Sequence, residues 1–198
     1  MQHQQRRGLR NRTAAVAAAL VGCITIAGPA EAAQQSKAAL IRDALSAAPP
    51  SIAATATVMD WDHSVLRQGS GNYICHPTPP PVRAKGGREP MCVDEVWEKW
   101  ADAWSNKKPF KADRVGVAYM LAGESPPAGA SNTDPFATTP TADNQWVVEG
   151  PHIMLLVPDA AQLEGVSTEP KNGGAYVMWK GSPYAHIMVP VAKRQGQR

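Results

Sequence analysis

The chain has 198 residues with 20 basic and 17 acidic side chains, a formal net charge of +3. Residues 1–32 hold four arginines and one glutamate, so the remainder is balanced in charge and lacks the basic surface that nucleic-acid binding requires. After this segment no apolar run is long enough to cross a bilayer, and the length suits one domain with a real core.

The N-terminal segment has the pattern of an export signal. An arginine-rich start is followed by an apolar run, Ala14–Gly28, and by a small-x-small tripeptide at 30–32. This order predicts a secretory signal peptide over 1–32 and an exported protein, periplasmic or secreted. The alternative is a lipid anchor, because Leu20–Cys23 resembles a bacterial lipobox that would leave Cys23 lipidated.

Two cysteines, Cys75 and Cys92, follow the signal segment. In an oxidising compartment they are expected to form a disulfide across a segment rich in proline and glycine. Such a bond would stabilise the fold by about 3 kcal/mol. The alternative for either residue is a reactive thiol.

The domain is expected to follow a short leader. Residues 33–50 read as an N-terminal helical leader, since Gln34–Ala48 has apolar residues at helical spacing before two prolines. We expect a single domain over 51–192 and a disordered tail over 193–198.

The first half of the domain alternates between strand and turn signals. Ile52–Asp60 is alternating and β-branched enough to predict a strand. Val65–Arg67 and Asn72–Cys75 flank a glycine-rich turn and predict a hairpin.

The clearest helix signal lies over Val93–Lys108. Val93, Trp97, Trp100 and Trp104 fall on a single helical face, with acidic residues near the start and lysines at the end. Packing of this face against a sheet is the first interpretation. The alternative is an exposed stacking platform for sugar rings or other flat ligands.

The second half predicts five more strands and one long loop. Arg114–Leu121 alternates as a strand, and Ala122–Gln145 is a long polar loop that its aromatic residues should keep docked. Four further strands are expected at Trp146–Glu149, Ile153–Val157, Tyr176–Trp179 and Ala185–Val191. The predicted fold class is α+β, with a mostly antiparallel sheet of five to seven strands and one main amphipathic Trp-rich helix packed on it.

The tripeptide His-Ile-Met occurs twice, in strands beginning near residues 152 and 186. Strand alternation puts aliphatic residues on one face of both strands and His152, Met154, His186 and Met188 on the other. We expect the aliphatic face to pack on the tryptophan helix, leaving the His/Met face to a second layer or a pocket.

Six stretches resemble a family of exported bacterial single-domain proteins. They are residues 56–62 (ATVMDWD), 91–108 (MCVDEVWEKWADAWSNKK), 131–138 (SNTDPFAT), 143–147 (DNQWV), 150–159 (GPHIMLLVPD) and 172–191 (NGGAYVMWKGSPYAHIMVPV). The resemblance covers nearly all of the chain after the signal segment. It implies a secreted single domain but no particular activity.

No common catalytic or phosphate-binding motif is present, so any site has to be assembled from scattered residues. The first hypothesis is a soft-metal site, because imidazole and thioether together suit Cu(I). Its expected ligands are His152, Met154, His186 and Met188, and Met120, Met178 or Trp179 would complete or shield the site. The alternative interpretation makes the methionines core fillers and the histidines buried, hydrogen-bonded side chains.

The second hypothesis is a hydrolase or another acid/base enzyme. His152 or His186 would act as the base. The possible partners are Asp60, Asp62, Asp134 and Asp143. Each aspartate is also explained as a turn cap.

The third hypothesis is a binding module for a small organic molecule, whose polar and aromatic side chains form the rim of a pocket. The expected pocket residues are Asp60, Asp62, Asn132, Asp134, Asp143, Trp146, Trp179 and Tyr184. We therefore expect a small molecule or a metal ion as the partner.

Overall fold

The computed structural model describes residues 29–194, with side chains from Ser36 onward. Most of the predicted signal peptide, Cys23 and residues 195–198 of the predicted tail lie outside the described residues. Among those that are described, no helix combines the length and apolar character needed to cross a membrane.

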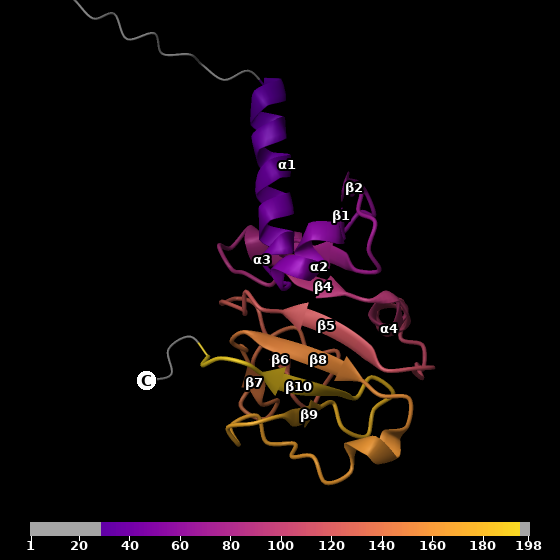
Figure 1. Cartoon of the computed structure of the whole chain (residues 1–198). Helices are drawn as coiled ribbons and strands as arrows, with labels where there is room; N and C mark the ends of the chain where they lie inside the picture. Colours follow the sequence, from indigo (N-terminus) through magenta and orange to yellow (C-terminus); the bar gives the residue numbers. More distant parts are fainter. Residues whose placement is uncertain (1–28, 195–198) are drawn as a thin grey trace, which may run out of the picture.

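The first helices of the chain lie at one end of a sheet, and a long loop region lies at the other end (Figure 1). The helices are α1 (Pro29–Leu45), α2 (Pro50–Thr55), α3 (Pro80–Arg83), α4 (Glu95–Ser105) and the 3-10 helix η1 (Ala160–Leu163). The strands of the main sheet are β1 (Thr57–Met59), β2 (Val65–Arg67), β3 (Ile74–His76), β4 (Met91–Val93), β5 (Gly116–Met120), β8 (His152–Leu156), β9 (Tyr176–Met178) and β10 (His186–Pro190). Strands β6 (Ala130–Ser131) and β7 (Trp146–Val147) form a separate pair.

The α+β class and the mostly antiparallel sheet are confirmed. The strand order is β2-β1-β3-β4-β5-β8-β10-β9, and β1 with β3 is the one parallel pair between the strands described. The sheet has eight strands and is larger than predicted. The added strand is β4, which lies between β3 and β5 just before the tryptophan helix begins.

The strand predicted over Ile52–Asp60 is wrong in its first half. Residues 50–55 form α2, and only Thr57–Met59 is a strand. Proline suits the first turn of a helix because its missing N–H needs no partner there, and Pro50 occupies that position. The short alanine-rich stretch that follows fits both the two-residue period of a strand and the 3.6-residue period of a helix. Its alternation therefore predicted a strand where a helix forms.

The predicted disulfide is present and joins two neighbouring strands. Cys75 on β3 lies directly opposite Cys92 on β4 and is bonded to it. Both cysteines are fully buried beside Ala44 and Ala47, at and just beyond the end of α1. The last turn of the leader therefore packs in the same core as the sheet, because its small side chains allow a close approach.

Helix α4 is fixed to the sheet at its first turn. The Asp94 carboxylate accepts hydrogen bonds from the backbone N–H of Val96 and Trp97, at 3.0 Å each, and so caps the helix. It also accepts a 2.7 Å bond from the N–H of Val117 on β5. Gly116 makes room for the helix, since a Cβ there would lie 2.9 Å from the Cβ of Val96.

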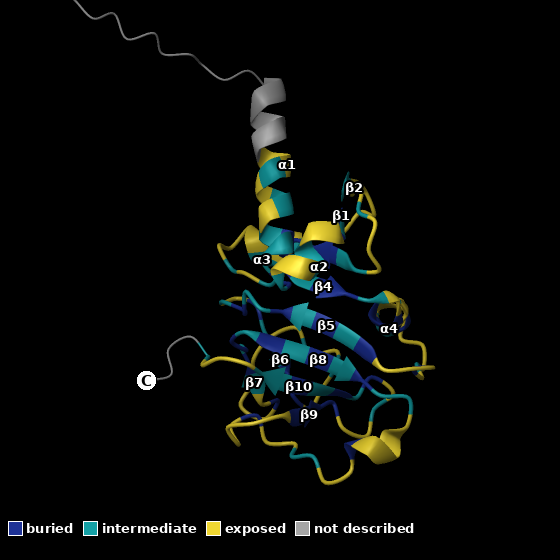
Figure 2. Ribbon diagram, in the orientation of Figure 1, coloured by how far each residue is buried: buried dark blue, intermediate teal, exposed yellow. Residues whose placement is uncertain are grey.

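The expectation that the aliphatic face meets the tryptophan helix is wrong. His152, Met154, His186 and Met188 are buried, and both methionines belong to the same core cluster as Trp97 and Trp100. The aliphatic residues between them are only half-buried, and Figure 2 shows this alternation along β8. Strand β5 explains why α4 packs on the His/Met face. Gly116 and Ala118 lie on that side of β5, and their small size lets a helix approach closely.

Candidate functional site

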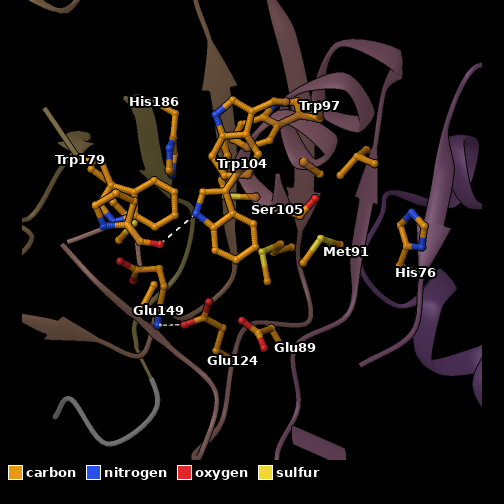
Figure 3. Close-up of a pocket in the computed structure, with 18 of the residues that line it drawn as sticks. His76, Glu89, Met91, Trp97, Trp104, Ser105, Glu124, Glu149, Trp179 and His186 are labelled. Carbon is orange, nitrogen blue, oxygen red and sulfur yellow. Dashed lines mark hydrogen bonds between the residues drawn. The ribbon is translucent and has the colours of Figure 1, made fainter. Parts of the chain in front are cut away.

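A cavity of about 650 Å³ lies over the His/Met face of the sheet. Helix α4 forms one wall, and the chain between β5 and β8 forms another (Figure 3). The lining is rich in sulfur and aromatic rings and also contains seven acidic side chains. It includes five of the seven methionines, namely Met91, Met120, Met154, Met178 and Met188. It also includes five of the six tryptophans, namely Trp61, Trp97, Trp100, Trp104 and Trp179.

The floor of the cavity is ordered by strand register. Met154 lies directly opposite Met188, and His152 lies opposite Met120 on one side and Pro190 on the other. His186 lies opposite Met178. Each histidine therefore has a methionine as its cross-strand neighbour.

The four predicted metal ligands share the cavity but do not meet at one point. His186 lies four residues from Pro190, the partner of His152, so the two backbone positions are about 13 Å apart along the strands. A metal ion bound by both imidazoles would lie about 2 Å from each nitrogen. Within the described residues no group of three or more His, Cys, Asp or Glu is placed to hold a metal ion.

His186 is enclosed by indoles. Its ring lies edge-on to Trp97, Trp100 and Trp179, with ring centroids 5.3, 5.7 and 5.1 Å away. Its Nδ1 donates a 3.0 Å hydrogen bond to the carbonyl of Tyr184, because a carbonyl can only accept. Burial lowers the pKa of His186 to about 4, so this imidazole is neutral at pH 7.

His152 is fully buried at the other end of the floor. Its Nδ1 donates a 2.7 Å hydrogen bond to the carbonyl of Gly150, which leaves the lone pair on Nε2. This Nε2 has no hydrogen-bond partner within residues 29–194. Burial lowers the pKa of His152, so the lone pair is available at neutral pH.

Two of the four cavity indoles near α4 also lack a partner. Trp104 donates its N–H to the carbonyl of Pro135 at 2.9 Å, and Trp179 donates to Ser131 at 2.6 Å. The N–H groups of Trp97 and Trp100 are buried and have no acceptor in the described part of the chain. A buried polar group without a partner costs about 1–3 kcal/mol, so such groups in a cavity favour a bound molecule or water.

Two carboxyl groups meet at the end of the cavity opposite the indoles, where Figure 3 shows Glu89 and Glu124 side by side. Arg88 and Ser125 form an antiparallel bridge, which puts the next residues, Glu89 and Glu124, opposite each other. Burial raises the pKa of Glu89 to about 7. Burial, and then the neighbouring Glu89, raise the pKa of Glu124 to about 8. This pair holds at least one proton at neutral pH.

A third glutamate, Glu149, lies behind this pair and forms an ion pair with Arg194. The carboxylate of Glu149 lies 2.6 Å from the guanidinium of Arg194 and accepts a 3.0 Å hydrogen bond from the hydroxyl of Tyr176. The N–H of Glu149 donates to the Glu124 carboxyl at 2.6 Å. Arg194 belongs to the predicted tail, so the first residues of that tail close the acidic end of the site.

The predicted His–Asp pairs are not formed, since both histidines use Nδ1 on backbone carbonyls. Each candidate aspartate instead accepts a hydrogen bond in its own turn: Asp60 from Trp61, Asp62 from Ser64, Asp134 from Phe136 and Asp143 from Thr141. The turn-capping interpretation therefore describes what these side chains do.

Only some of the predicted pocket residues line the cavity. Asp60, Asp134 and Trp179 line the cavity. The rest are absent from its wall: Asp62, Asn132, Asp143, Trp146 and Tyr184. Asn132 and Tyr184 are buried in packing roles, with the Tyr184 hydroxyl donating to the carbonyl of Lys108 at 3.0 Å. Trp146 lines a smaller hollow beside Arg194.

Sequence reasoning missed the carboxyl pair and Met91 as parts of the site. Glu89 precedes a proline and Glu124 follows a glycine, so both read as turn residues. Strand alternation from β4 would have put Glu89, Met91 and Val93 on one face, but this required β4 to be identified first. Nothing in the sequence pairs Glu89 with Glu124, because their contact depends on a bridge between distant segments.

The carboxyl pair predicts a loss of stability as the pH rises. Because burial raises both pKa values above the usual value near 4.5, the folded state binds protons more tightly, and this stabilisation is lost as the pH rises through 7 to 8. We expect the free energy of unfolding to fall by about 1.4 kcal/mol or more between pH 7 and pH 9. Urea unfolding at a series of pH values measures it.

Glu124→Gln should remove most of this pH dependence, because glutamine has no proton to lose. The matched control is Glu164→Gln, since Glu164 is exposed on the surface. A wild-type stability that does not fall over this range, or a fall that Glu124→Gln leaves unchanged, would contradict the assignment of the protonated pair.

Comparison with family models, with curated proteins and with solved structures finds no match to this chain.

Proposed function

We propose that this exported domain binds a small organic molecule in the cavity over the His/Met face. The ligand has a flat, largely apolar body and at least one hydrogen-bonding group. The volume of about 650 Å³ falls within the usual range for small-molecule sites. Methionine side chains adapt their shape to a ligand, and indole rings offer flat faces for stacking.

The unpartnered polar groups on the cavity wall carry this proposal. The indole N–H groups of Trp97 and Trp100 would donate to an acceptor on the ligand, and His152 Nε2 would accept from a hydroxyl or amine. A wall that only filled a hydrophobic core would have no reason to leave three polar groups without partners. Few polar groups in a mostly apolar wall are also what orients a ligand.

The exported location remains part of the proposal. It is supported by the arginine-rich, apolar N-terminal segment in the sequence and by the buried Cys75–Cys92 disulfide, a bond typical of oxidising compartments. A lipid anchor at Cys23 is the alternative form of the same export.

Acid/base catalysis is the second candidate function, and the Glu89–Glu124 pair favours it. Two carboxyl groups with pKa values of about 7 and 8 can give and take a proton near neutral pH. Both line the cavity, so a bound molecule would have access to them. This pair replaces the His–Asp pair as the possible acid/base group of a hydrolase.

Blocking the cavity tests the binding proposal. N-phenyl-1-naphthylamine is a neutral, flat probe, and we expect saturable one-to-one binding measured by its fluorescence. Ala101 lies on α4 and lines the cavity, so Ala101→Trp should weaken binding at least about tenfold by filling part of the cavity.

Lys99→Trp is the matched control, because Lys99 is an exposed residue of the same helix that does not line the cavity. It should bind the probe as the wild type does. Equal binding by all three proteins would show that the probe binds elsewhere and would overturn the proposal.

A panel of chromogenic esters and glycosides tests the catalytic candidate. Any turnover that depends on the carboxyl pair should fall about 100-fold or more in Glu89→Gln and in Glu124→Gln, since general acid/base catalysis contributes at least that much. Glu164→Gln should have no effect. Turnover that survives both substitutions in the cavity would reject the pair as the catalytic acid and base.

A further inference from the structure

At one end of the cavity floor an imidazole lone pair lies among thioethers, a combination that the organic-ligand proposal does not explain. His152 is held by the Gly150 carbonyl so that Nε2 is the free nitrogen, and this atom is buried with no partner in the described chain. Its pKa is lowered by burial, so the lone pair is not taken by a proton at neutral pH. A buried, fixed and neutral imidazole nitrogen is a preformed metal ligand.

Three methionines surround His152 by register. Met120 on β5 is directly opposite it, a relation that puts Cβ atoms about 4.5–5.5 Å apart. Met154 is two residues along the same strand on the same face, and Met188 on β10 is the diagonal neighbour, about 7–8 Å away. Methionine has three side-chain bonds to rotate, so these spacings are within its reach. All four residues line the cavity.

The chemistry of this set selects the ion. Three thioethers and one imidazole are soft, neutral ligands, which suit Cu(I) and its analogue Ag(I) rather than Ca²⁺, Mg²⁺ or other oxygen-binding ions. The charge of Glu149 favours a cation at His152, and that of Arg194 opposes one. A single positive charge is therefore easier to bury here than a double one.

We propose that His152, Met120, Met154 and Met188 form a binding site for one monovalent soft metal ion. The set differs from the pattern read from the two His-Ile-Met tripeptides. His186 is excluded because it lies beyond Met188 at the opposite end of the floor, edge-on to three indoles. Met120 on the neighbouring strand takes its place. The metal site does not require the proposed organic ligand, but both proposals use His152 Nε2, so a ligand bonded to that nitrogen and the metal ion would exclude each other.

Silver titration tests the site. Ag(I) needs no reductant, so the Cys75–Cys92 disulfide stays intact during the measurement. The protein is the full chain with Cys23→Ser, because the free thiol at that position would bind silver itself. Isothermal titration should find one tight Ag(I) per chain.

Replacing a thioether by leucine keeps volume and folding, so Met120→Leu and Met154→Leu report on coordination alone. Each should weaken Ag(I) binding at least about tenfold, or about 1.4 kcal/mol. Met91→Leu is the matched control, since Met91 lines the same cavity on the far side of Met120 from His152. It should bind silver as the parent does.

Three results would overturn the site: no stoichiometric binding, binding that both leucine variants retain, or equal weakening in Met91→Leu. Binding of N-phenyl-1-naphthylamine by the same variants keeps the two proposals apart. A chain that binds the organic probe but no silver would reject the metal site and leave the proposed function intact.

Discussion

The close contact between α4 and the small residues of β5 determines which face of the sheet α4 covers, and therefore which side chains enclose the cavity. Gly116 and Ala118 leave a hollow on one face of the sheet, and Asp94 ties the first turn of α4 to β5 over it. The antiparallel register then puts both histidines and the floor methionines on that same face. Since the tryptophan stripe of α4 faces this floor, the most polarisable side chains of the protein enclose one space.

The same enclosure sets the protonation of the site. Burial disfavours charge, so it lowers the pKa of His152 and His186 and raises the pKa of Glu89 and Glu124. The two histidines are therefore neutral near pH 7, the carboxyl pair holds at least one proton, and Glu149 is paired with Arg194. A wall of this kind suits neutral, polarisable or weakly polar ligands better than strongly charged ones. Both the organic ligand and the soft ion follow from this property.

The sequence was sufficient for features that depend on local periodicity. The 3.6-residue spacing of Trp97, Trp100 and Trp104 and the alternation around His152 and His186 identified segments that are helical and extended in the structure. Both faces of β8 and β10 are apolar, however, so alternation alone could not say which face α4 would cover. That choice depended on two small residues in another strand.

Long-range pairing explains what the sequence did not reveal. Glu89 and Glu124 are far apart in the chain and meet only through the Arg88–Ser125 bridge. Met120 becomes a neighbour of His152 only through the pairing of β5 with β8. The two His-Ile-Met tripeptides, in contrast, looked like one site because they are identical, yet antiparallel pairing puts their histidines at opposite ends.

The protonation state of the two buried histidines tests the account most directly. Long-range ¹H–¹⁵N correlation of histidine-labelled protein at pH 7 shows which ring nitrogen carries the proton, and His152→Gln and His186→Gln assign the signals. The structure predicts neutral rings for His152 and His186, with the proton on Nδ1 and a bare Nε2. A charged ring at this pH, or a proton on Nε2 of His152, would mean that the cavity does not enclose these side chains as described.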